Sequence, residues 1–187
     1  MRTVSQTMKE HKAMDYTLAL KSITEKGVFA GYASVFDVVD SQRDVVMPGA
    51  FRDTLALRDT PVKLLWQHRI DEPIGVISAL FEDGRGLYIE GQLLLDVAQA
   101  REAYALLKAG AVTGLSIGYT PRRYVRDPDS GVRKLQAVDL VEVSLVTLPA
   151  NARAQVTVVK DARQALDATQ VLRTAEAIDR AIGVLRA

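Results

Sequence analysis

The chain has 187 residues, of which 48% are hydrophobic and 25% are charged, a balance typical of a folded domain and not of a disordered chain. Its formal net charge of +1 argues against binding to phosphate backbones, and the lack of Cys excludes disulfides, thiolate zinc sites and a Cys nucleophile. The two histidines, His11 and His68, are too few for a multi-His metal site. No apolar run is long enough to cross a bilayer, and the polar residues 1–15 lack the apolar core of a signal peptide, so neither membrane insertion nor secretion is expected.

Most of the first half of the chain alternates between apolar and polar residues, which predicts strands. Residues 1–15 show no period and are expected to form a flexible arm. The elements expected after the arm are a strand over 16–24, a strand over 28–36, a polar loop over 37–49, a short helix over 50–57, a strand over 62–68, a turn over 69–73, and a hairpin of strands 74–81 and 87–95 around a turn at 82–86.

The period changes after residue 95. Asp96 is a suitable N-cap for a helix over 97–109, and Gly110 suits its C-terminal end. Strands are then expected over 113–125, 133–148 and 155–160, with a turn at 127–131. Residues 161–187 lack Pro, and their apolar residues step by four and three, which predicts a separate C-terminal helix. The fold class expected is mainly β (α+β), a barrel or sandwich with one inserted helix and a C-terminal helix.

Ser116 lies in the sequence Gly-Leu-Ser-Ile-Gly, which has the G-x-S-x-G form. The strand-to-helix elbow of α/β-hydrolases is excluded, because a helix precedes this motif, a strand follows it, and no His comes after Ser116. On a strand, Gly114 and Gly118 share the face of Ser116 and leave bare backbone beside its hydroxyl. Taken alone, the two glycines favour a bulge or a tight barrel corner with an incidental Ser over a functional one.

Two further side chains could carry chemistry. His68 ends the strand 62–68, where it either faces a cleft or is hydrogen-bonded into the adjacent turn. Glu142 lies in the apolar run 138–146, where a carboxylate is costly to bury unless it is paired. A His is one such partner, and an edge strand with Glu142 facing solvent is the alternative. Asp139, on the opposite face of the same strand, is the competing acid.

Several motifs follow one another through residues 16–160. They are GYASVF at 31–36, DVVMPGAF at 44–51, WQH at 66–68 with PIG at 73–75, GL at 86–87 with GQL at 91–93, AYALLK at 103–108 with Gly110, GLSIGY at 114–119, and DLVEVSLV at 139–146 with PAN at 149–151. This series resembles the prohead proteases of tailed bacteriophages, serine proteases that share a fold with the herpesvirus assemblins. The resemblance implies a protease domain over residues 16–160 with a herpesvirus-assemblin-like β-barrel.

The resemblance implies roles for single residues. His68 would be the general base and Ser116 the nucleophile. In the herpesvirus relatives a second His completes the triad, but no His follows His68 here, so the third role passes to Glu142, with Asp139 left open. Three further positions are candidates for binding the oxyanion or the substrate: the backbone N–H of Asn151, the side chain of Arg153, and Gly118. No metal and no organic cofactor is implied.

The function that the resemblance implies is that of a serine endopeptidase inside the phage procapsid, in the host bacterial cytoplasm. Its expected partner and substrate is the major capsid protein with its scaffolding segment, and it would also process itself. A homodimer stays open, and neither nucleic acid nor a membrane is an expected partner. Residues 161–187 would serve in targeting or docking, or as a self-processed tail. The alternatives are an inactive scaffolding homologue, a β-barrel module that binds partners, and a hydrolase of small esters.

Overall fold

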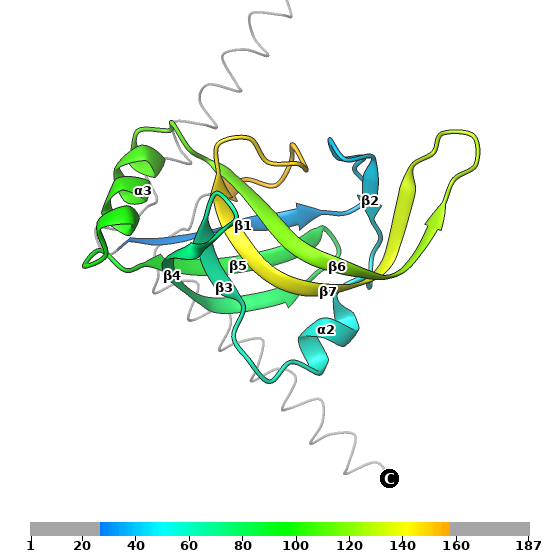
Figure 1. Ribbon diagram of the computed structural model, residues 1–187, viewed down its shortest axis with the longest axis horizontal. Coiled ribbons are helices and arrows are strands. Elements are labelled where there is room, and N and C mark those ends of the chain that lie inside the picture. Colours follow the sequence, from blue (N-terminus) through cyan, green and yellow to red (C-terminus); the bar gives the residue numbers. More distant parts are fainter. Residues whose placement is uncertain (1–26, 158–187) are drawn as a thin grey trace, which may run out of the picture.

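Eight strands form one sheet in the structure, a computed structural model that describes residues 27–157 (Figure 1). In chain order the elements are β1 (Val28–Val35), β2 (Asp44–Val46), α2 (Arg52–Ala56), β3 (Lys63–Trp66), β4 (Arg69–Glu82), β5 (Gly86–Leu93), α3 (Ala98–Lys108), β6 (Gly114–Arg126), β7 (Arg133–Val146) and β8 (Val156–Thr157). The mainly β fold with one inserted helix is therefore confirmed. The arm over 1–15, the strand over 16–24 and the helix over 161–187 lie outside the described residues.

The sheet has the strand order β2-β7-β3-β4-β5-β1-β8, and β6 pairs with β7 beside this path. The hairpins β3–β4, β4–β5 and β6–β7 are antiparallel, as alternating strands with short turns predict. Strand β7 also pairs in parallel with β3 and with β2. This long strand thus joins segments that are far apart in the sequence, and it brings β3 next to β6–β7.

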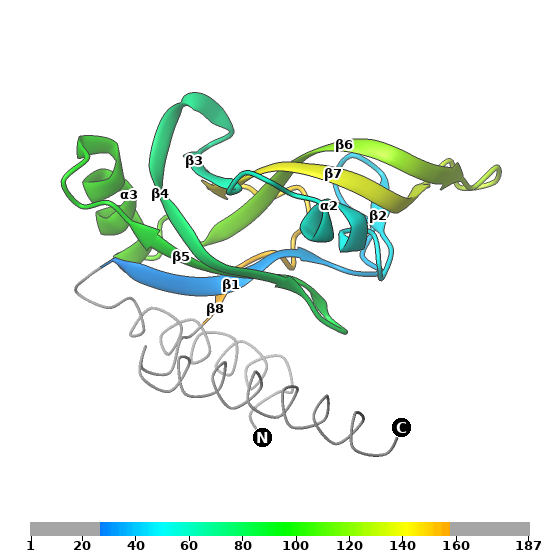
Figure 2. The same ribbon diagram turned by 90° about the horizontal axis from the view of Figure 1, so that it is seen from below.

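The sheet curls, and residues 154–156 join its two ends (Figure 2). The N–H of Leu115 in β6 donates to the carbonyl of Ala154 (3.0 Å), and the N–H of Tyr32 in β1 donates to the carbonyl of Gln155 (3.2 Å). Val156 completes the link by donating to the carbonyl of Thr113 (2.9 Å). The expected barrel is thus a curled half-barrel whose two ends are linked by this segment.

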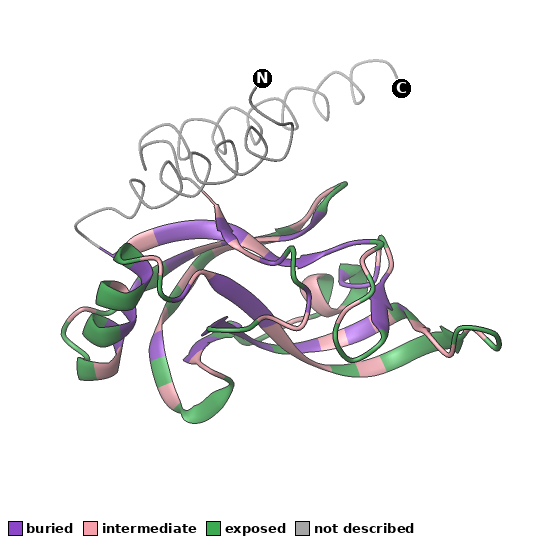
Figure 3. Cartoon of the chain, turned by 90° about the horizontal axis from the view of Figure 1, so that it is seen from above, coloured by how far each residue is buried: buried purple, intermediate pink, exposed green. Residues whose placement is uncertain are grey.

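Buried residues are concentrated on the strands and on one side of helix α3, whereas the far end of the β6–β7 hairpin is largely exposed (Figure 3). The side chains that are fully excluded from water include Leu64, Ile74, Ile89, Leu115 and Leu145, one from each of five strands. Burying a side chain of this size contributes about 1.5–3 kcal/mol. Helix α3 packs on β4 and β5 through its buried Ala and Leu residues, and α2 packs on β7. The far end of the β6–β7 hairpin is exposed, so the rigid part of the fold surrounds the other half of β6 and β7.

Strand β2 lies within residues 37–49, which the sequence predicted as a loop. All three of its residues are buried, and they pair in parallel with Arg133–Leu135 of β7. The loop prediction was wrong at this point because the partner strand and the cation that pairs with Asp44 lie about 90 residues downstream.

Two boundaries also differ from the predictions. Strand β3 ends at Trp66 and β4 begins at Arg69, so residues 69–73 are strand and not turn. Helix α3 has Val97 at its N-cap with no side-chain hydrogen bond, so the predicted cap at Asp96 was wrong. Instead, a guanidinium nitrogen of Arg101 donates to the Asp96 carbonyl (3.1 Å). None of the helices within residues 27–157 has the length and apolar character required to span a bilayer.

Candidate active site

His68 lies in a two-residue turn between β3 and β4. Trp66 pairs with Arg69, so Gln67 and His68 alone connect the two strands. Their φ angles are +51° and +62°, in the left-handed region, as in a type I′ turn. For residues other than Gly this conformation costs about 1–3 kcal/mol each and persists only where the surroundings impose it. His68 is therefore a turn residue and not the strand residue that the sequence predicted.

Strand β7 holds this turn in place. The N–H of Gln67 donates to the carbonyl of Leu145 (3.0 Å). The Gln67 amide donates from Nε2 to the Thr147 hydroxyl (2.8 Å), and its Oε1 accepts the Thr147 N–H (3.3 Å). The position of His68 is thus fixed relative to the strand that carries Glu142.

Glu142 contacts the imidazole directly. Its Oε1 lies 2.6 Å from Nδ1 of His68, a residue 74 positions away in the sequence. The Glu142 side chain is 7% exposed and that of His68 is 44% exposed, so the buried carboxylate is paired. The hydrogen bond to Glu142 raises the pKa of His68 above its usual 6.5, although burial opposes this shift. Because a carboxylate accepts, Nδ1 carries the proton, and Nε2 is the nitrogen that can take up another.

Asp139, the competing acid, does not reach the imidazole. Its carboxylate accepts a hydrogen bond from Nε of Arg122 (2.5 Å), and its side chain is 41% exposed. It lines a separate groove next to α2. Of the two acids that the sequence left open, the structure brings Glu142 to His68.

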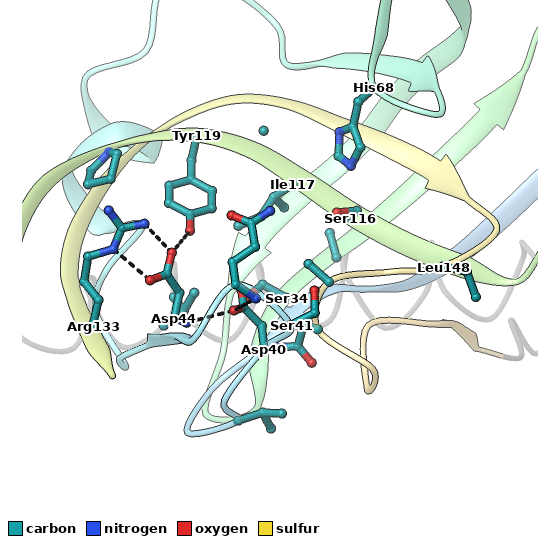
Figure 4. A pocket seen from close by; sticks show the side chains of 18 residues that line it. Ser34, Asp40, Ser41, Asp44, His68, Ser116, Ile117, Tyr119, Arg133 and Leu148 are labelled. Atoms are coloured by element: carbon teal, nitrogen blue, oxygen red, sulfur yellow. Dashed lines mark hydrogen bonds and ion pairs between the residues drawn. The ribbon is translucent and has the colours of Figure 1, made fainter. Parts of the chain in front are cut away.

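Ser116 lies on β6 in the same cleft as His68 (Figure 4). It pairs with Ser144 of β7, and Gly118 pairs with Glu142, so these four residues share one face of the β6–β7 hairpin. The imidazole of His68 points toward Ser116 in Figure 4. Ser116 is 7% exposed, and its hydroxyl makes no hydrogen bond within residues 27–157. Hydrogen bonds between nucleophile and base are often long in free enzymes and shorten when substrate binds.

The cleft beside Ser116 has a volume of about 530 Å³. Its far wall contains an ion pair between the buried Asp44 and the partly exposed Arg133, in which Arg133 donates from Nε to Oδ1 of Asp44 (2.7 Å) and from Nη2 to Oδ2 (2.5 Å) (Figure 4). The Tyr119 hydroxyl also donates to Oδ2 of Asp44 (2.6 Å). Burial raises the pKa of Asp44, but the hydrogen bonds from Arg133 and Tyr119 outweigh it and lower the pKa overall. These groups join β2, β6 and β7 and give the cleft a rigid wall.

The three further candidates lie in different surroundings. Gly118 lines the cleft, and a Cβ at this position would overlap the Glu142 carboxylate, so the glycine makes room for the acid. Asn151 also lines the cleft, and its side chain donates to the carbonyl of Val35 (2.7 Å). Its backbone N–H makes no hydrogen bond within the described part of the chain. Arg153 is exposed and does not line the cleft.

Two residues at the site were not singled out from the sequence. Ser144 is fully buried and contacts both Glu142 and the backbone of His68. Gln67 holds the turn, as described above. In the sequence, only the alternation that places Ser144 on the same strand face as Glu142 could have indicated Ser144. Residues 27–157 contain no cluster of three or more His, Cys, Asp or Glu side chains that could hold a metal ion.

The profile of a known family, described as caudovirus prohead serine protease, matches residues 15–169. The chain belongs to this family. It is therefore a peptidase of the serine type. The prohead protease of Enterobacteria phage HK97 is 35% identical over 156 residues, which are 81% of this chain and 67% of that protein. A capsid polyprotein of Pseudomonas phage PAJU2 is 34% identical over 160 residues, which are 82% of this chain and 23% of the polyprotein.

Solved structures of viral proteases are also similar to this protease. The protease of Kaposi's sarcoma-associated herpesvirus, in complex with a hexapeptide phosphonate inhibitor, matches with a TM-score of 0.49 and 18% identity. That match covers 75% of this chain and 67% of the herpesvirus chain. The capsid assembly protease of bacteriophage T4 matches with a TM-score of 0.48 and 12% identity, over 64% of this chain and 81% of the other.

Proposed function

We propose that this protease is the maturation endopeptidase of a phage procapsid, and that it cleaves the scaffolding segment of the major capsid protein and the protease chain itself. The observation that carries the chemical part is that His68, hydrogen-bonded to the buried Glu142, lines the same cleft as Ser116. The family and the relatives named as a prohead protease and a capsid polyprotein support the capsid protein as substrate and partner. The site of action is then the procapsid interior in the host cytoplasm.

Catalysis proceeds as acyl transfer through three residues. Nε2 of His68 takes the proton of the Ser116 hydroxyl as Oγ attacks the carbonyl carbon of the scissile peptide bond. The imidazolium then gives this proton to the leaving amine, and an acyl-enzyme remains on Ser116. A water molecule, deprotonated by the same imidazole, attacks the ester carbonyl, and the imidazolium returns the proton to Oγ of Ser116 as the acid product leaves. Glu142 keeps the proton of the resting imidazole on Nδ1 and stabilises the imidazolium in both steps.

The oxyanion of the tetrahedral intermediate requires donors that are already in place. The backbone N–H of Asn151 fits this role, since it lines the cleft and has no other partner among the described residues. The Asn151 side chain holds its loop, with Oδ1 accepting the N–H of Arg153 (3.1 Å). Gly118 contributes bare backbone to the same cleft. Arg153 is exposed and does not line the cleft, so we assign it no role in holding the oxyanion.

Co-expression of the full chain with the major capsid protein of the same phage, followed by mass spectrometry of the particles, tests the proposal. We expect the wild-type protease to shorten both the capsid protein and itself, and Ser116→Ala to leave both intact. Ser78→Ala, which removes a hydroxyl from an exposed position on β4, is the matched control and should behave as wild type.

Other outcomes would contradict the proposal. Full-length capsid protein in particles that contain the wild-type chain would indicate an inactive scaffolding homologue. Turnover of small esters without cleavage of the capsid protein would indicate an ester hydrolase. If Ser116→Ala changed no measurable property of assembly, the chain would be a module that only binds partners.

A further inference from the structure

We propose that Ser144 is a positioning residue for both the acid and the base of this protease. The proposal rests on the function proposed above, because it assigns to Ser144 the task of presenting Glu142 and His68 to one another. Ser144 itself does not line the cleft and has no exposed surface, so it acts through these two residues and not on the substrate.

The hydrogen bonds of Ser144 determine which group donates and which accepts. The backbone N–H of His68 can only donate, and it donates to Oγ of Ser144 (3.0 Å). The single hydroxyl proton of Ser144 is then free to point to Oε2 of Glu142, 2.7 Å away. Both carboxylate oxygens are thereby used, since Oε2 accepts from Ser144 while Oε1 accepts from Nδ1 of His68. One hydroxyl thus closes a ring that contains the acid, the imidazole and the backbone of the base.

The sheet places Ser144 where this ring is possible. On one side of β7 it pairs in antiparallel register with Ser116, and on the other side in parallel register with Leu65 of β3. The turn that carries His68 begins just after β3, so the N–H of His68 comes to lie over Ser144. A serine two residues after Glu142 on the same face is therefore within reach of the acid and of the strained turn at once.

Ser144 also restrains both partners of the Glu142–His68 contact. Glu142 has three side-chain torsions, and the hydrogen bond to Oε2 restrains the last of them while Oε1 faces the imidazole. His68 has φ of +62°, and Ser144 supplies the acceptor for the N–H of that turn residue. Without the hydroxyl, a buried carboxylate oxygen and a backbone N–H lose their partner together, which favours reorientation of both groups.

Substitution of Ser144 by Ala tests the proposal in the full chain. We expect kcat for a capsid-derived peptide to fall by about 10- to 100-fold, as for a misplacement of reacting groups on the ångström scale, with KM nearly unchanged. We also expect the pKa of His68 to fall toward its ordinary value, because the carboxylate that raises it is no longer held. NMR titration of the imidazole measures this pKa, with the His68 resonance assigned by comparison with His68→Ala.

Three further variants separate positioning from a purely structural effect. Ser144→Thr keeps the hydroxyl and should retain most of the turnover. Ser144→Cys keeps a side chain of similar volume but donates a weaker hydrogen bond to Glu142. If the alanine variant does not fold, the cysteine variant should show the same fall in kcat and in the pKa of His68. Thr54→Val is the matched control, since Thr54 on α2 also accepts a backbone N–H of β7, from Leu140 (3.1 Å), but lies away from the cleft. It should lower the thermal stability while leaving kcat and the imidazole titration unchanged.

Different results would contradict the proposed function and the proposed role of Ser144. If Ser116→Ala retained peptide cleavage, the proposed function would be wrong, whatever Ser144 does. If Ser116→Ala is inactive but Ser144→Ala folds with wild-type kcat, or with an unchanged or raised pKa of His68, then Ser144 does not position the pair. A Thr variant as slow as the Ala variant would also contradict the proposal.

Discussion

The fit between Gly118 and Glu142 gives a sharp prediction for Gly118→Ala. A Cβ built at position 118 would lie 3.0 Å from both Cδ and Cγ of Glu142 and closer still to Oε1, whereas ordinary van der Waals contacts begin at 3.4 Å. The carboxylate must therefore move by about 1 Å, and a displacement of this size at a reacting group costs ~100-fold in rate. This factor corresponds to about 2.7 kcal/mol of transition-state stabilisation.

The assay is kcat for a capsid-derived peptide, with thermal unfolding measured on the same samples. Gly84→Ala is the matched control, because Gly84 lies in the exposed β4–β5 turn and a Cβ there would meet no atom within 4 Å. We expect Gly84→Ala to behave as wild type and Gly118→Ala to be folded and slow. A folded Gly118→Ala variant with wild-type kcat would show that the position of the Glu142 carboxylate does not matter to catalysis.

Further predictions concern the acid, the Asp44–Arg133 ion pair and the tail. Glu142→Gln should reduce kcat by up to about 10⁴-fold, less than loss of the nucleophile, because the acid moves no proton itself. The base must be neutral, so the raised pKa of His68 places the acidic limb of kcat/KM above pH 6.5 in the wild type, and Glu142→Gln should move it lower; an unmoved limb would contradict the pairing. Asp44→Asn should lower the free energy of unfolding by about 1.5–3 kcal/mol at pH 7, because the partly exposed Arg133 loses its hydrogen bonds to a buried carboxylate. Since the pKa of Asp44 is lowered, this difference should vanish as the pH falls through that pKa, which urea unfolding at several pH values measures. Deletion of residues 161–187 should leave peptide cleavage intact and reduce incorporation into procapsids; the reverse result would make the tail part of the catalytic fold.

Short-range patterns in the sequence were sufficient for most of the fold. Alternation and turn residues identified β1, the β4–β5 hairpin, β6 and β7, and the change of period at residue 96 identified α3. Glycine at 110 has φ of +73°, as the predicted helix end requires. The short strand β2 could not be predicted, because three residues carry no period and its stability comes from pairing with β7.

The site required information that no local pattern contains. Three features were visible in the sequence: the residue types around Ser116, the unusual Glu142 in an apolar run, and His68 as one of only two histidines. The choice between Glu142 and Asp139 depends on the parallel pairing of β3 with β7, which sets Lys63 beside Glu142 and brings the following turn over the strand. The same long-range pairing forces a left-handed backbone on residues 67 and 68, for which Gln and His give no local signal.

Covalent labelling by a fluorophosphonate reagent tests whether Ser116 is the nucleophile and His68 its base. Such a reagent reacts with a serine only when a base activates its hydroxyl. We predict a single adduct, located by peptide mass spectrometry at Ser116, which forms in the wild type and is lost in His68→Ala although that variant stays folded. An adduct on another residue, or labelling of Ser116 at the wild-type rate in His68→Ala, would contradict the assignment of these two residues as nucleophile and base.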